Sequence, residues 1–97
     1  MAIYIVLVQF TDQGIRHIKD TTKRGDAITE MAKKFGVTAR GYYWTLGRYD
    51  VIDFFDAPDD ASMAAFLASF GAMGNARTET LRAFPQADMN GILAKLE

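Results

Sequence analysis

The sequence contains no cysteine and a single histidine among its 97 residues. Without cysteine there can be no disulfide, no thiolate metal site and no cysteine nucleophile. This is compatible with a reducing compartment, so we expect a cytoplasmic protein. Any histidine-based metal site, triad or proton shuttle has to use His17 alone or with the copy from another chain.

A strong charge of one sign and long apolar runs are also missing. The 11 basic and 12 acidic side chains give a formal net charge of −1, too little to attract nucleic acid or an anionic membrane. The apolar run over residues 3–8 is too short to span a bilayer and lacks the features of a signal peptide. We therefore expect neither nucleic acid nor a membrane as a partner.

What the chain does contain is enough apolar residues for a core. Hydrophobic residues make up 49% and charged residues 24%, the profile of an ordinary globular protein. A chain of this length buries a core without disulfides, but a second domain does not fit. We predict one domain over residues 1–97.

The first predicted strand, over residues 2–10, is apolar on both of its alternating sides. One side carries Ile3, Ile5 and Leu7, and the other carries Tyr4, Val6, Val8 and Phe10. A strand with this pattern is buried on both faces and belongs in the centre of a sheet.

The rest of the chain alternates helical and strand patterns. Strand patterns recur over 37–46, 49–55 and 75–84, while helical patterns span 12–35 with a polar break at 20–25, then 59–73 and the segment after 85. Gly36 and Gly74 end the two long helices, and Gly47-Arg48 forms a short hairpin turn. The order predicts an α+β fold of the ferredoxin-like βαββαβ type with an extra C-terminal helix.

This topology leaves one face of the sheet uncovered. Two right-handed β-α-β units give an antiparallel sheet of order 4-1-3-2 with both long helices on the same face. The central strand is apolar on the other face too, and monomers usually hide such a patch. A second copy of the chain is the simplest cover, so we predict a homodimer or a higher homo-oligomer.

Three segments of the chain, residues 11–16, 43–51 and 75–84, resemble the GYD domain family. The glycine, any residue, tyrosine and aspartate that name the family stand here as Gly47, Arg48, Tyr49 and Asp50. The resemblance covers nearly the whole chain and implies a dimeric α+β barrel. It implies no particular reaction, because the wider superfamily mixes small oxygenases, isomerases, haem-handling enzymes and ligand-sensing domains. Asp53 departs from the pattern, since an apolar residue is commoner at such a strand position.

Tyr49 and Asp50 are the first candidates for a ligand-binding site. A phenol and a carboxylate near the mouth of a cavity can orient a ligand or transfer a proton. The alternative interpretation is structural, because an aspartate after a turn accepts backbone N–H bonds and a tyrosine fills a strand face. Turn chemistry accounts for both residues, so we favour the structural interpretation.

Charged residues inside the predicted strands are further candidates, because they either face water or line a polar pocket. If the odd-numbered positions of the third strand face the open side, they line a space between two copies. These positions are Tyr49, Val51, Asp53 and Phe55. Arg77 and Glu79 of the fourth strand either join them or pair across strands.

Tyr43 and His17 complete the candidate ligand-binding residues. Tyr43 belongs to an aromatic run that could stack nucleic-acid bases, but the near-neutral charge favours core and interface packing. His17 falls between Ile15 and Ile18 on the first helix, toward solvent or the rim of a dimer. We favour a surface histidine over a ligand-binding one, because no second base or ligand accompanies His17 at helical spacing.

Five aspartates between positions 50 and 60 raise the question of a metal site. Asp50 and Asp53 point to opposite faces of a strand, while Asp59 and Asp60 are accounted for by a helix start. We predict no metal site and no cofactor.

Two hypotheses about function follow. The first is a homo-oligomeric binding module that holds a small organic ligand on the sheet face or only mediates assembly. The second is a small cofactor-independent oxygenase or isomerase acting on an aromatic or quinone-like substrate. Its hydrogen bonds and base would come from Tyr49, Asp50, Asp53 and His17. The sequence shows no evident catalytic set, so we favour the first hypothesis.

Overall fold

The first strand lies inside the sheet, as its two apolar sides predict. In the computed structural model, which describes residues 1–97, β1 (Ala2–Phe10) pairs antiparallel with β3 (Val51–Ala57) and with β4 (Ala76–Ala83). Strand β2 (Thr38–Trp44) pairs with the outer edge of β3. The order β2-β3-β1-β4 is the predicted order read from the other edge, so the ferredoxin-like topology is confirmed.

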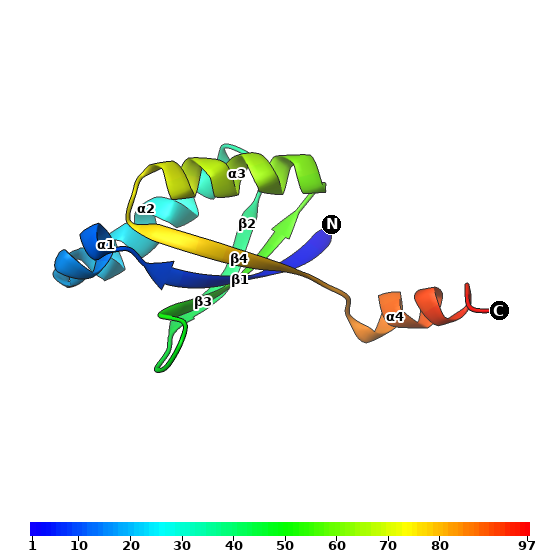
Figure 1. The fold of residues 1–97 in the computed structure, drawn as a ribbon. Helices are drawn as coiled ribbons and strands as arrows, with labels where there is room; N and C mark the ends of the chain where they lie inside the picture. Colours follow the sequence, from blue (N-terminus) through cyan, green and yellow to red (C-terminus); the bar gives the residue numbers. More distant parts are fainter.

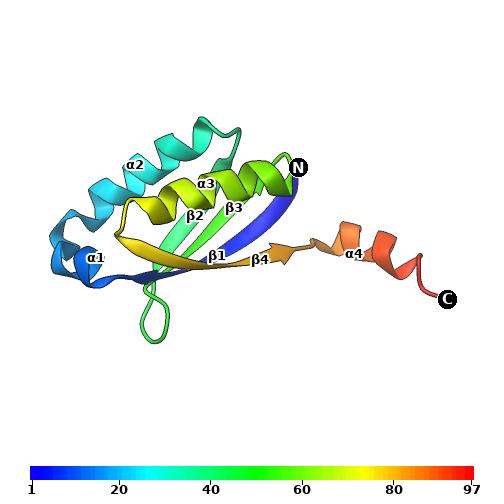
Figure 2. The same cartoon turned by 45° about the horizontal axis from the view of Figure 1, so that its top comes forward.

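The two long helices, α2 (Thr21–Lys33) and α3 (Asp60–Ala72), cover one face of this sheet (Figures 1 and 2). A short helix α1 (Asp12–Arg16) and one turn of 3₁₀ helix, η1 (Ile18–Asp20), lead from β1 into α2. The predicted extra helix, α4 (Gln86–Leu93), lies beyond the end of β4 and away from the other helices. None of these helices combines the length and hydropathy needed to cross a membrane.

Capping residues begin and end these helices at defined positions. The Thr11 hydroxyl accepts a hydrogen bond from the Gly14 N–H, and the Asp59 carboxylate accepts one from the Ser62 N–H. Gly36 and Gly74 follow α2 and α3 with φ of 73° and 84°, the left-handed conformation that glycine adopts at little cost. The predicted break at 20–25 is misplaced, because the chain bends at residues 17–20 and is already helical from Thr21.

The core lies between the helices and one side of the sheet. Phe66 of α3 is fully buried, with its ring 5.1 Å from that of Phe55 on β3 and 6.2 Å from that of Phe35 after α2. On β1, Tyr4, Val6 and Val8 face this layer. Their partners across the sheet share the same face, because directly paired residues point the same way.

The pairing register shows that the parity considered for β3 is wrong. Val51, Asp53 and Phe55 pair with Val8, Val6 and Tyr4, so they lie beneath the helices. The open face instead receives the even-numbered positions of β3. Asp53 is therefore part of the layer between helices and sheet.

The hairpin between β2 and β3 is longer than the predicted two-residue turn. Its loop spans residues 45–50 and is closed by a hydrogen bond of 2.9 Å from the Thr45 N–H to the Asp50 carbonyl. Gly47 has the expected positive φ, 104°. The longer loop places Tyr49 at the base of the hairpin instead of inside β3.

Gly14 lets α1 pack directly on the chain that leads into β4. A Cβ atom at this position would lie 2.0 Å from the Asn75 carbonyl oxygen, which already accepts a hydrogen bond from the Thr11 N–H. The Thr11 hydroxyl also donates to the Gly74 carbonyl. The junction therefore has no room for a side chain.

We expect Gly14→Ala to lower the free energy of unfolding by about 1–3 kcal/mol, the usual cost of overpacking. The matched control is Gly71→Ala on α3, where an added Cβ meets no atom within 4 Å. That change should be neutral or stabilise by up to about 1 kcal/mol, because alanine favours helix over glycine. Urea unfolding of the two variants measures both effects. Equal changes at the two positions would contradict the packing described for Gly14.

Candidate functional site

The open face of the sheet carries an apolar patch that no element of the chain covers. It is built from positions that alternate with the core positions of all four strands. The patch comprises Ile3, Ile5, Leu7, Tyr43, Ile52, Phe54 and Leu81. Tyr43 is 67% exposed and packs its ring edge-on against Phe54 at 6.4 Å. We call these seven residues the open-face patch.

A polar groove of about 390 Å³ borders this patch at the hairpin end. Its lining includes Leu7, Arg48, Tyr49, Arg77 and Glu79. The Tyr49 hydroxyl donates a hydrogen bond of 3.0 Å to the Glu79 carboxylate, which raises the pKa of the phenol. The structure thus brings two candidate residues, Tyr49 and Arg77, to one groove on the open face.

Asp50 has a structural role in the same hairpin. Its carboxylate accepts a hydrogen bond of 2.8 Å from the Phe10 N–H, and its own N–H donates to the Val8 carbonyl. These bonds attach the end of the hairpin to the end of β1. The structural interpretation of Asp50 therefore agrees with its contacts.

His17 lies apart from the groove. It is exposed at the end of α1, with Nδ1 2.9 Å from the Gln13 carbonyl oxygen. It contributes neither to the groove nor to the pocket described next.

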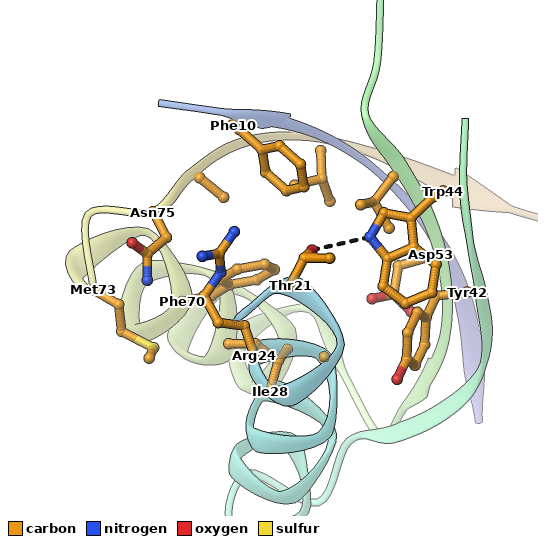
Figure 3. A pocket seen from close by; sticks show the side chains of 14 residues that line it. Phe10, Thr21, Arg24, Ile28, Tyr42, Trp44, Asp53, Phe70, Met73 and Asn75 are labelled. Carbon is orange, nitrogen blue, oxygen red and sulfur yellow. Dashed lines mark hydrogen bonds between the residues drawn. The ribbon is translucent and has the colours of Figure 1, made fainter. Parts of the chain in front are cut away.

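A second cavity lies between the helices and the sheet, on the opposite side from the open-face patch (Figure 3). Its volume is about 50 Å³, several times the roughly 10–15 Å³ that one water molecule needs. Its lining comes from β1, α2, β2, β3, α3 and the start of β4. It includes Phe10, Thr21, Arg24, Tyr42, Trp44, Asp53 and Phe70. We call it the interlayer pocket.

Asp53 is the one acidic residue in the lining of the interlayer pocket. Its side chain is 7% exposed, and its Oδ1 atom has no hydrogen-bond partner. Burial raises the pKa of this carboxyl from 3.8 to about 7, because the charged form loses its hydration. A buried polar atom without a partner is unusual, since desolvation then goes uncompensated.

The sequence pattern alone does not predict the interlayer pocket. Its walls are brought together by tertiary packing from six elements, and residues such as Trp44 and Phe70 look like ordinary core positions in the sequence. The usable signal is Asp53 itself, an acid in a strand whose neighbours two positions away, Val51 and Phe55, are both apolar. Correct strand parity would have placed it beneath the helices.

Comparisons with known proteins agree with this architecture. The family model described as GYD domain matches residues 4–93. A Thermus thermophilus protein named "Glutamine synthetase and cystathionine beta-lyase binding protein" is 32% identical over 90 residues, which are 92% of this chain and 95% of that protein. A crystal structure of a chain from Thermus thermophilus superposes with a TM-score of 0.56 and 22% identity. That match covers 88% of this chain and 95% of the other, and it supports the fold alone.

The raised pKa of Asp53 predicts how stability depends on pH. The folded protein holds this proton more tightly than the unfolded chain, so its stability falls as pH rises from about 4 to about 7 and then levels off. At pH 8 we expect Asp53→Asn to be more stable than the wild type by about 2–4 kcal/mol, at about 1.4 kcal/mol per tenfold change in proton affinity. Near pH 4 the two proteins should be close in stability. Urea unfolding at both pH values provides the measurement.

The control is Asp56→Asn, on the same strand but paired with Arg40 at 3.1 Å on the other side of the sheet. It should not reproduce the gain at pH 8. If the wild type loses no stability relative to Asp53→Asn between pH 4 and pH 7, the raised pKa of the Asp53 carboxyl is contradicted.

Proposed function

This chain belongs to the GYD domain family, and from that premise we propose that it is a homo-oligomeric binding module. Its open-face patch pairs with a second copy to form a dimeric α+β barrel, and the assembly binds protein partners. The observation that carries the proposal is the apolar face of β1 and its neighbours, which the chain's own helices leave in water.

The charges around the open-face patch suit a second copy of the chain. Arg77 and Glu79 lie on the same strand, and Arg40 pairs with Asp56 at the other edge of the sheet. In a two-fold interface each patch meets its own copy, so arginines of one chain can face carboxylates of the other. The net charge of −1 gives little repulsion between the copies.

Helix α4 supports the same proposal. It lies beyond the sheet (Figure 2) and carries the large apolar side chains of Met89 and Leu93, which are exposed, as is Leu96 just after the helix. Phe84, in the connection from β4, is 50% exposed as well. Exposed apolar side chains on a helix that lies away from the other helices are usually covered by another chain, and a second copy of this chain can cover those of α4.

Protein partners are proposed from the relative that shares 32% identity. That protein is named for binding glutamine synthetase and cystathionine beta-lyase. The match spans nearly the full length of both chains, so no additional domain of the relative accounts for its name. We propose that this chain also binds an enzyme of one of these two kinds.

The oxygenase or isomerase hypothesis lacks a grouped set of side chains. Tyr49 lies in the groove of the open face, Asp53 lines the interlayer pocket, and Asp50 is bonded to the backbone of β1. His17 is exposed at the end of α1. Since these four residues do not share a site, no observation favours that hypothesis over a binding module.

Ile5→Asp should disrupt the oligomer without unfolding the chain. Ile5 lies in the open-face patch and is half-buried in the single chain, so a carboxylate there would lose all contact with water only in the assembly. We expect the dissociation constant of the oligomer to rise by roughly 100-fold or more, because burying an unpaired carboxylate costs several kcal/mol. Native mass spectrometry across a concentration series measures the effect, and circular dichroism checks the fold.

Two further variants serve as controls for Ile5→Asp. Leu46→Asp, in the fully exposed hairpin loop, should leave the oligomer unchanged. Val6→Asp should unfold the chain, because Val6 is in the core beneath the helices. A wild-type protein that stays monomeric at all concentrations would overturn the proposed assembly.

Binding to enzymes is tested with purified glutamine synthetase and cystathionine beta-lyase from the organism that encodes this chain. We expect at least one of them to bind the immobilised wild-type protein in biolayer interferometry, at a level that bovine serum albumin does not reach. Signal from neither enzyme would reject the protein-partner part of the proposal while leaving the oligomer part to its own test.

A further inference from the structure

The interlayer pocket contains a buried carboxyl group without a counter-charge. Asp53 lies among apolar side chains, and its Oδ1 atom accepts no hydrogen bond from the protein. No lysine or arginine forms an ion pair with it. A carboxylate in such surroundings is costly, and a donor that enters the pocket would offset that cost.

Arg24 is the basic residue of the pocket lining, but it is held elsewhere. Its guanidinium donates to the His17 carbonyl at 2.7 Å and to the Gly14 carbonyl at 3.0 Å. It also lies over the Phe10 ring, 5.5 Å from the ring centre. Figure 3 shows Arg24 across the pocket from Asp53. The chain itself therefore supplies no counter-charge for Asp53.

Aromatic rings form much of the wall around this carboxyl. Tyr42 and Trp44 lie beside Asp53 (Figure 3), with their ring centres 5.4 Å apart in an edge-on arrangement. The Trp44 Nε1–H donates to the Thr21 hydroxyl at 3.0 Å, which fixes the indole against α2. The faces of aromatic rings attract cations, as a carboxylate does. The aromatic walls and Asp53 therefore both favour a positively charged ligand.

We propose that the interlayer pocket binds a small organic ammonium compound, with its ammonium group against the Asp53 carboxylate and its apolar part along the aromatic wall. The cavity of about 50 Å³ favours a small alkylamine over an aryl amine, because an apolar cavity that holds benzene measures about 150 Å³. All of its lining residues come from one chain, so this site is independent of the oligomer and of the enzyme partner proposed above.

The proposal has a defined pH dependence. The other titratable side chains that line the pocket are Arg24 from α2 and Tyr42 from β2, while β1, α3 and β4 contribute none. Ammonium binding requires the ionised form of Asp53, whose pKa is about 7 in the empty pocket. As pH increases toward about 7, affinity should therefore rise by roughly tenfold per pH unit, and above about pH 7 it should level off.

The test uses n-butylammonium as the probe and n-butanol as its neutral analogue, with NMR titration of the full chain at pH 6 and pH 8. We expect n-butylammonium to shift the amide signals of residues around the pocket, to bind more tightly at pH 8, and to outcompete n-butanol. Asp53→Asn should weaken binding at pH 8 by about tenfold or more, because the charge-assisted hydrogen bond is lost. Asp56→Asn should leave the affinity unchanged.

A second measurement does not depend on the variant. In the wild type, saturating n-butylammonium should lower the pKa of the Asp53 carboxyl, followed by its ¹³C chemical shift. An unchanged pKa, equal binding to Asp53→Asn, or a preference for n-butanol that weakens as pH rises would each overturn the proposal. The last result would instead show that Asp53 acts as a neutral hydrogen-bond donor.

Discussion

The apolar character of β1 on both of its faces is the constraint on which the rest of the structure depends. One apolar face is covered by α2 and α3, and Ile28 of α2 and Phe66 of α3 belong to the same buried cluster as Val6. The other face carries Ile5 and the rest of the open-face patch, and it stays uncovered within one chain. Because hydrophobic stabilisation follows the apolar area removed from water, the same strand that organises the core also creates the demand for a partner.

The two faces of the sheet divide the candidate chemistry between them. The open face offers the groove of Tyr49, Arg77 and Glu79, where polar groups pair with one another and remain in contact with water. The helix-covered face encloses Asp53, whose Oδ1 atom is buried without a hydrogen-bond partner in the chain. An ionised carboxylate therefore costs little free energy on the open face, where water and polar groups surround it. On the helix-covered face the same charge is unfavourable, because its surroundings are apolar. This difference makes Asp53 the more informative residue for ligand chemistry.

Much of the fold follows from local patterns, whereas the candidate site follows from them only in part. Gly36, Gly74 and the Asp59 cap are local signals, and each ends or begins a helix where the pattern indicates. Tyr49 and Arg77 do share a groove, but no local signal shows that Asp53 lies on the other side of the sheet. The pairing of Trp44 with Val51 is the register that a turn centred on Gly47-Arg48 gives, but the hairpin does not determine which of its two faces the helices cover.

The sequence by itself determined the element types, their order, the central position of the strand over residues 2–10 and the existence of two apolar sheet faces. Side-chain alternation and helix periodicity are properties of a short stretch of chain, so they can be recognised without tertiary contacts. Only the tertiary structure decided which face the helices cover, and with it the burial of Asp53 and the assembly of the interlayer pocket. Those features depend on pairing register and on contacts between residues far apart in the chain, which no local pattern contains.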